Sequence, residues 1–292
     1  MSRPPTLLLP SVARAAQLDT PRGRFAALDA RPARQAAGTA LLLPGYTGSK
    51  EDFLAVLAPL TEQGYRVVAV DLRGQYESPP ASGPEAYALG ELAADVLVLA
   101  EHLGDGPVHV LGHSFGGLVA RGAVLERSAA FRSLTLLGSG PAAIPGPRAE
   151  RLRLLVAALP HLDMTEIRDQ MEALERADGR QVQSAEIEQF LRARFLANCS
   201  DGLLTMGRQL LDERDRTAEL LATGVPVHVV YGEADDAWPP HEQADMARRL
   251  GARGAVVPRA AHSPAAERPA ETAAVLAAFW QDVNADGVQP RS

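Results

Sequence analysis

The chain is patterned as short apolar runs that alternate with longer amphipathic stretches. The apolar runs have the length of strands and are bounded by turn residues, which is typical of strands buried on both faces of a sheet: 39–43, 65–71, 108–112, 134–138, 225–231 and 254–257. Apolar residues recur at helical spacing over 50–63, 85–103 and 265–283. A strand, turn, strand pattern over 17–29 adds an antiparallel hairpin. The pattern predicts an α/β fold with a doubly wound, mostly parallel sheet.

The alternation breaks between residues 141 and 223, where the pattern predicts helices only. Two apolar stripes recur there at helical spacing: Met164, Ile167, Met171 and Leu174, and then Ile187, Phe190, Leu191 and Phe195. Two roles are open to these stripes, the core of the insertion itself and the wall of a ligand pocket. We expect an all-helical cap over 141–223, inserted after the sixth strand, and a core built from 1–140 and 224–292.

Composition narrows the class of protein. The 292 residues suit one large domain or a domain with an insertion, and 46% of them are hydrophobic. The formal net charge of −7, without a basic block, argues against nucleic acid or an anionic membrane surface as a partner. Cys199 is the one cysteine, so no internal disulfide can form. The apolar run 7–9 is too short for a signal-peptide core, and no later run spans a membrane. We therefore expect a soluble cytoplasmic protein.

The stretch 108–120 carries the first candidate for chemistry. An apolar strand ends at Gly112, the sequence Gly-His-Ser-Phe-Gly-Gly follows, and a helix-compatible run comes next. This is the arrangement of a nucleophile elbow, in which a tight turn lifts a serine hydroxyl above the sheet. The flanking Gly112 and Gly116 remove the side chains for which the turn has no room. The alternative is a glycine-rich turn with serine as a helix cap, but the strand before and the helix after favour Ser114 as a nucleophile.

A serine nucleophile needs a histidine base that a carboxylate orients. Of seven histidines, His262 lies in a loop between the last strand and the last helix. That loop is at the carboxyl end of the sheet, where Ser114 also lies and where such sheets bind ligands. His109 and His228 lie inside apolar strands and are expected in the core, while His113 is expected to pack beside the elbow. The other three lie at helix ends or in the insertion.

The carboxylate is expected between Ser114 and His262 in the chain. The turn after the strand 225–231 offers Glu233, Asp235 and Asp236, whereas the turn after 134–138 has no acid. A solvated acidic turn is the alternative for this segment, and the spacing from the strand leaves the choice among the three acids open.

Backbone N–H groups must hold the oxyanion of a tetrahedral intermediate. The residue after the nucleophile, Phe115, supplies one N–H, and the loop 44–49 after an earlier strand offers the N–H of Tyr46. No phosphate-loop or zinc-helix spacing is present: the Gly-Ser-Lys at 48–50 and the His-Glu at 241–242 both lack the remaining residues. We expect neither a cofactor nor a metal.

These motifs together resemble the α/β-hydrolase fold with a lid, over about residues 38–140 and 224–283. The chain is similar to its serine esterase and lipase-like members, and more loosely to cofactor-free haloperoxidases and carbon–carbon-bond hydrolases. The elbow at 112–117, the turn at 232–235, the histidine loop at 261–264 and the Asp-x-Arg-Gly turn at 71–78 carry the resemblance. In the family the acid comes three residues after the glycine of its turn, which favours Asp235 over Asp236.

The chain departs from the family at two places. Pro44-Gly45 stands where the family often has His-Gly, so the internal hydrogen bonds of the oxyanion loop must differ. The Asp-x-Arg-Gly turn usually continues with His-Gly, but here it continues with Gln75 and Tyr76, and either side chain can reach the pocket. Members with an aspartate nucleophile are disfavoured because residue 114 is serine.

The sequence thus predicts a lidded serine hydrolase of a small, partly apolar acyl substrate such as an ester, thioester or lactone. Ser114, His262 and Asp235 form the triad, and Tyr46 and Phe115 form the oxyanion hole. The residues expected to line the substrate pocket are Tyr76, Met164, Ile167, Met171 and Phe195. Carbon–carbon-bond cleavage, haloperoxidase-like chemistry on the same triad and a non-catalytic small-molecule receptor are the alternatives.

Overall fold

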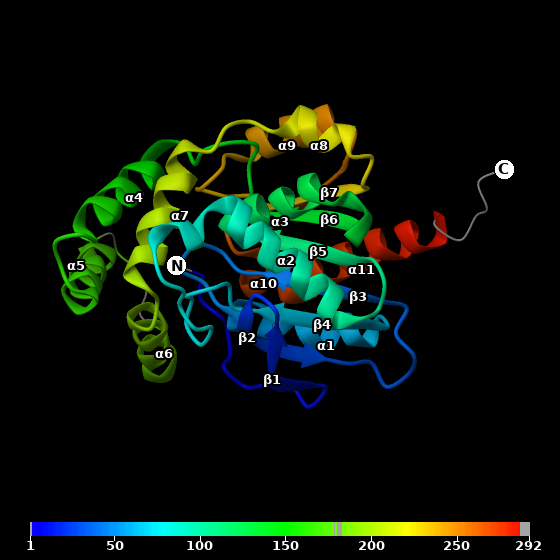
Figure 1. Ribbon diagram of the computed structural model, residues 1–292, viewed down its shortest axis with the longest axis horizontal. Helices are drawn as coiled ribbons and strands as arrows, with labels where there is room; N and C mark the ends of the chain where they lie inside the picture. The colour runs from blue at the N-terminus through cyan, green and yellow to red at the C-terminus, as the bar shows by residue number, and fades with distance from the viewer. Residues whose placement is uncertain (1, 178, 180–182, 287–292) are drawn as a thin grey trace.

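An eight-stranded sheet forms the centre of the fold (Figure 1). The computed structural model describes residues 2–177, 179 and 183–286. The strands lie in the order β1-β2-β4-β3-β5-β6-β7-β8, in which the pairs β1–β2 and β2–β4 are antiparallel and all other neighbours are parallel. The strands are β1 (Ala13–Thr20), β2 (Gly23–Ala30), β3 (Gly38–Leu43), β4 (Tyr65–Val70), β5 (Val108–His113), β6 (Phe131–Leu137), β7 (Val227–Gly232) and β8 (Arg253–Val257). The predicted doubly wound, mostly parallel sheet is confirmed.

Helices cover both faces of this sheet (Figure 1). One face packs against α1 (Leu54–Glu62), the short α10 (Pro264–Glu267) and α11 (Pro269–Asp286). The other face packs against α2 (Leu89–Leu103), α3 (Phe115–Glu126) and α9 (Pro240–Leu250). The described residues also form three 3-10 helices, η1 (Lys50–Phe53), η2 (Pro84–Tyr87) and η3 (Ser128–Ala130). Because both faces are covered, the central strands are apolar on both sides.

The single helix predicted over 265–283 is wrong, because the segment forms two helices. Arg268 lies between α10 and α11 with a non-helical backbone (φ −140°, ψ 63°). Pro269 follows it, and a proline disfavours the helical conformation of the residue before it. The break leaves α10 as a separate short helix directly after the loop that holds His262.

The segment between β6 and β7 forms five helices, and its described residues contain no strand. They are α4 (Gly146–Ala158), α5 (Met164–Ala177), α6 (Ala185–Leu196), α7 (Ser200–Asp212) and α8 (Thr217–Ala222). We call α4 to α7 the cap; within it α4 packs against α7 and α5 against α6. Figure 1 shows these four helices grouped beside the sheet, whereas α8 packs against α3 and α9. The division of the chain into a core and a separate cap domain stays a prediction.

His109 and His228 lie in the core, as predicted. Both side chains are fully buried; the His109 ring stacks on Trp280, and the His228 ring packs on Phe279. Burial, with a smaller contribution from the positive charge of Arg253, lowers the pKa of His228 from 6.5 to about 3. Among the described residues neither ring nitrogen of His228 has a hydrogen-bond partner, so nothing offsets the cost of burying its charged form.

This burial predicts a pH dependence of stability. The unfolded chain protonates His228 near pH 6.5 and the folded chain only near pH 3, so stability is fully present above pH 6.5 and falls between these values. We expect His228→Leu to lose less unfolding free energy than wild type between pH 7 and 4.5, measured by urea denaturation. His102→Gln, at the exposed end of α2, is the control; equal slopes for wild type and His228→Leu would contradict the prediction.

Candidate active site

Ser114 occupies a strained turn between β5 and α3. Its backbone has φ 54° and ψ −121°, a left-handed conformation that a non-glycine residue seldom adopts. A Cβ on Gly112 would come within 2.1 Å of the Gly116 carbonyl oxygen, and one on Gly116 within 2.5 Å of the Pro44 carbonyl oxygen. Only glycine fits at these two positions, because the obstructing atoms are backbone. The local sequence therefore forms the sharp strand-to-helix turn that the Gly-x-Ser-x-Gly pattern predicts.

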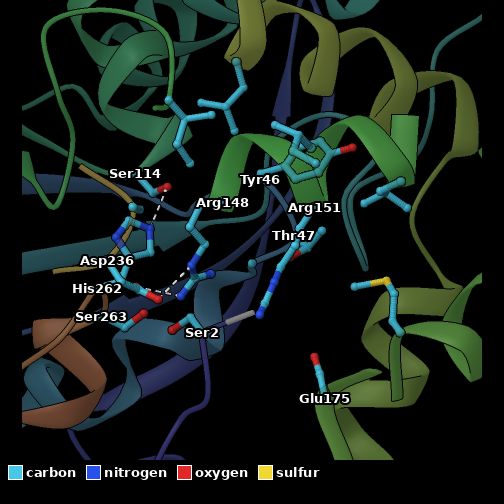
Figure 2. A pocket seen from close by; sticks show the side chains of 18 of the residues that line it. Ser2, Tyr46, Thr47, Ser114, Arg148, Arg151, Glu175, Asp236, His262 and Ser263 are labelled. Atoms are coloured by element: carbon cyan, nitrogen blue, oxygen red, sulfur yellow. Dashed lines mark hydrogen bonds and ion pairs between the residues drawn. The ribbon is translucent and has the colours of Figure 1, made fainter. Parts of the chain in front are cut away.

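The structure brings His262 and Asp235 to this serine. His262 Nε2 lies 3.0 Å from Ser114 Oγ, and His262 Nδ1 lies 3.0 Å from Asp235 Oδ1 (Figure 2 shows the Ser114 contact). His262 comes from the loop between β8 and α10, and Asp235 from the turn after β7. The three side chains thus meet at the carboxyl ends of β5, β7 and β8.

The carboxylate of Asp235 is buried and accepts hydrogen bonds from several protein groups. Burial alone would raise its pKa, but hydrogen bonds from His262, the Ala237 N–H and Gln243 outweigh burial and lower the pKa below 3.8. The Gln243 Nε2 donates to Asp235 Oδ2 at 2.9 Å and is itself fully buried. Asp235 therefore stays ionised beside the imidazole, and Gln243 is a supporting residue that the sequence pattern did not reveal.

Asp236 points away from His262. It accepts two hydrogen bonds from Arg148 of α4, from Nε at 3.0 Å and from Nη2 at 2.8 Å (Figure 2). The Asp236 side chain is 58% exposed, whereas that of Asp235 is fully buried. The two neighbouring acids therefore have different partners: Asp235 binds His262, and Asp236 binds Arg148.

The loop after β3 lies against the elbow. A Cβ on Gly45 would come within 3.2 Å of the Ser114 Cβ, and the Tyr46 ring packs edge-on against Phe115. The Tyr46 hydroxyl donates to the Leu203 carbonyl of the cap at 2.6 Å, and burial raises its pKa. Phe115 is the first residue of α3, so its N–H is not paired within the helix. Tyr46 and Phe115 are thus brought to Ser114 from two different strand ends.

Gln75 supports this loop from the turn after β4. Its Nε2 donates to the carbonyl oxygens of Gly45 and Tyr46, each at 2.9 Å, and its Oε1 accepts the Leu72 N–H at 3.2 Å. The side chain is fully buried and is not among the residues that line the cavity described next. The Gln75 side chain therefore binds backbone groups and does not face the cavity.

A second set of buried contacts ties η1, which directly follows this loop, to the cap. Asp52 accepts a hydrogen bond from Arg194 Nη1 of α6 at 2.7 Å, and both side chains are almost fully buried. Arg194 Nη2 also donates to the Ser2 carbonyl at 2.7 Å. A residue from the start of the described chain, a cap helix and η1 therefore meet at one point.

A cavity of about 560 Å³ opens above Ser114 and His262. Much of its wall is apolar and comes from the cap and its borders: Ile144, Leu152, Leu154, Leu155, Ala158, Ile167, Met171, Leu174 and Leu210. Polar side chains form the remaining wall, including Thr47, Arg148, Arg151, Glu175 and Asp236 (Figure 2). Its volume and mixed wall are typical of a small-molecule site.

The pocket residues expected from the sequence are only partly found there. Ile167 and Met171 of α5 line the cavity, together with Tyr46. Tyr76, Met164 and Phe195 are not among the residues that line this cavity, and their role in substrate binding stays a prediction. The reason differs for each of these three residues.

Tyr76 packs edge-on against Phe190 and beneath the Lys50 ammonium group, so its ring is occupied by cap and loop contacts. Phe195 is fully buried in the hydrophobic core, with the Arg168 guanidinium over its ring. Met164 begins α5 and packs against the hydrophobic core. The wall contributed by α4 was missed, although Leu155 and Ala158 recur at helical spacing in the sequence.

The described residues contain no group of three or more His, Cys, Asp or Glu side chains placed to hold a metal ion. Within the same residues, no helix combines the length and the apolar character needed to cross a bilayer.

Sequence comparisons relate the chain to known hydrolases. The model of the alpha/beta hydrolase family matches residues 40–275. A relative from Variovorax paradoxus (strain S110) is 35% identical over 139 residues. It is named as a carbamate hydrolase, RutD, and that activity is provisionally assigned. The 139 residues are 47% of this chain and 50% of that relative. The chain thus spans about half the length of such relatives.

Solved structures share the fold along nearly the whole chain. A thermophilic esterase from Thermogutta terrifontis superimposes with a TM-score of 0.74 at 23% identity, covering 93% of this chain and 100% of that one. A hydrolase from Pseudomonas aeruginosa PA01 has a TM-score of 0.73 at 26% identity, covering 91% and 98%. The sheet topology, the serine turn and the match over residues 40–275 lead to one conclusion. The chain belongs to the alpha/beta hydrolase family.

Proposed function

We propose that the protein is a serine hydrolase that cleaves a carboxylic ester, or a related thioester or lactone, of a small and partly apolar substrate. The observation that carries this proposal is the hydrogen-bonded series Asp235–His262–Ser114 at the base of a largely apolar cavity. The name of the solved esterase with the same fold is in keeping with this substrate class.

In the proposed reaction Ser114 Oγ attacks the substrate carbonyl while His262 Nε2 takes the hydroxyl proton. Asp235 accepts the Nδ1–H of His262 and stabilises the imidazolium that forms. The N–H groups of Tyr46 and Phe115 hold the oxyanion of the tetrahedral intermediate. His262 then gives its proton to the leaving alkoxide, and the acyl group stays on Ser114. A water molecule, deprotonated by His262, releases the acid by the same steps in reverse.

The first prediction concerns the nucleophile. We expect Ser114→Ala to lower turnover of 4-nitrophenyl butyrate roughly 10⁴-fold or more, because triad members act as a unit. A fluorophosphonate probe should label wild type stoichiometrically at Ser114, as read by peptide mass spectrometry. Labelling should be lost in His262→Ala.

Two outcomes would count against the proposal. A folded Ser114→Ala protein that keeps more than about a tenth of wild-type turnover would remove the serine from the chemistry. Labelling of Ser114 without turnover on a panel of esters, thioesters and lactones would instead indicate a receptor that retains a reactive serine.

The second prediction distinguishes the two acids. Asp235→Asn should lower kcat by about 10⁴-fold, because an amide holds the imidazole in the wrong tautomer. Asp236→Asn is the matched control: Asp236 does not bind His262, and the change weakens its ion pair with Arg148 at the cavity wall, which is worth about 0–1 kcal/mol. Steady-state kinetics of both variants decide the matter, and the reverse ranking would assign the triad acid to Asp236.

The third prediction concerns the cavity wall. Ile167→Ala and Met171→Ala shorten side chains that line the cavity, so both should shift preference toward longer acyl chains. The ratio of kcat/KM for 4-nitrophenyl octanoate over acetate should rise by roughly tenfold, since a methylene in an apolar pocket is worth about 1–3 kcal/mol. Met164→Ala, on the same helix but outside the cavity, is the control. Unchanged ratios in both wall variants would show that the acyl group binds elsewhere.

A further inference from the structure

We infer that Gln75 is a positioning residue of the oxyanion hole, which sets the direction of the Tyr46 N–H through the backbone of the loop after β3. This inference rests on the proposed function, because it concerns the same oxyanion. Its basis is the set of contacts that Gln75 makes between two turns of the sheet's carboxyl edge.

Every hydrogen-bonding atom of the Gln75 amide is used. The two N–H bonds of Nε2 are directed to two successive carbonyl oxygens, those of Gly45 and Tyr46, at 2.9 Å each. Oε1 accepts the Leu72 N–H, which ties the side chain to its own turn. The opposite orientation of the amide would place Oε1 against two carbonyl oxygens and an NH2 group against an N–H. The contacts therefore define which amide atom faces the loop.

The planarity of the peptide bond transmits this contact to the oxyanion site. The Gly45 carbonyl and the Tyr46 N–H belong to one trans peptide unit, so they point in opposite directions. Gln75 binds the carbonyl from outside the cavity, whereas Gly45, Tyr46 and Thr47 line the cavity. The Tyr46 N–H is therefore directed away from Gln75 and toward the side on which Ser114 lies.

The second donated bond fixes the next peptide unit in the same way. The Tyr46 carbonyl, held by Gln75, shares its plane with the Thr47 N–H. Donation to each carbonyl also polarises the peptide and strengthens the N–H on its other end. One buried side chain thus holds two consecutive peptide planes beside the nucleophile.

The loop's own backbone supplies part of this support, because the Gly48 N–H donates to the Gly45 carbonyl at 3.0 Å. Pro44 has no N–H, and Gly45 has no side chain to hold the loop. The sequence has glutamine at 75, where the family's turn usually continues with histidine. The structure assigns to that glutamine a second hydrogen bond to the Gly45 carbonyl and the bond to the Tyr46 carbonyl, which together hold both peptide planes.

Three variants test the inference. Gln75→Ala removes all three hydrogen bonds, and Gln75→Met removes both N–H donors while keeping most of the side-chain volume. Gln209→Ala is the matched control: Gln209 also accepts one backbone N–H, from Leu89, and donates to two carbonyls, those of Tyr87 and Thr205, and it does not line the cavity.

We expect both Gln75 variants to lower kcat on 4-nitrophenyl butyrate by roughly 10- to 100-fold, somewhat less than the loss of a direct oxyanion donor. KM should change less than about threefold, because the oxyanion forms only after binding. Affinity for a trifluoromethyl ketone, whose adduct with Ser114 carries an oxyanion, should weaken by the same factor as kcat/KM. Gln209→Ala should leave all three quantities near wild type, although its melting temperature falls by a similar amount.

The outcomes separate this inference from the proposed function. If turnover depends on Ser114 but both folded Gln75 variants keep wild-type kcat, the inference on Gln75 is wrong and the serine hydrolase stands. A loss confined to KM, an equal loss of kcat in Gln209→Ala, or failure of both Gln75 variants to fold would assign Gln75 a purely structural role and overturn the inference. If Ser114→Ala itself keeps activity, the proposed function fails first.

Discussion

The strained turn at Ser114 is the constraint on which the rest of the site depends. A left-handed serine between a strand and a helix costs of order 1–3 kcal/mol and persists only where its surroundings hold it. Here the Ser114 N–H donates to the Leu137 carbonyl of the neighbouring strand at 2.9 Å, and the Gly117 N–H donates to the Ser114 carbonyl at 2.9 Å. The backbone of Gly112 lies so close to that of Gly116 that a side chain on Gly112 would clash with the turn. The sheet thus stabilises a local conformation that places the hydroxyl in the cavity.

The parallel sheet explains why three side chains that are far apart in the chain meet at one edge and could be singled out from the sequence. Parallel strands end at the same edge, so residues just after β5, β7 and β8 must lie near one another however far apart they are in the chain. Turn residues after apolar runs located Ser114, His262 and the acidic turn 233–236, and the family resemblance then favoured Asp235 within that turn. The same logic located the Tyr46 loop, which follows β3, the strand that pairs with β5.

The cap could be predicted only as a set of helices, because helical spacing identifies an apolar face but not what that face meets. Ile167 and Met171 face the cavity, whereas Phe195, on an equally apolar stripe, is fully buried in the hydrophobic core and does not line the cavity. Tyr76 has a left-handed backbone (φ 42°), and no local sequence rule gave its direction. The contacts of Gln75 could not be predicted for a different reason. Its partners are backbone carbonyls about 30 residues earlier in the chain, and a sequence pattern does not indicate backbone partners.

The contacts between cap and core differ in how firmly they hold. The Arg194–Asp52 pair from α6 is buried, and breaking such a pair by removing one partner costs about 3–5 kcal/mol, because the remaining charge is left unpaired. The Tyr46 hydroxyl bond to Leu203 of α7 is also part-buried. By contrast, α4 is joined to the acid turn by the more exposed Arg148–Asp236 pair, which salt screens and which is worth about 0–1 kcal/mol. The polar contacts therefore constrain α6 and α7 more than α4. The cap is held most firmly where α6 and α7 meet η1 and Tyr46, and less firmly along α4, one of the apolar walls of the cavity.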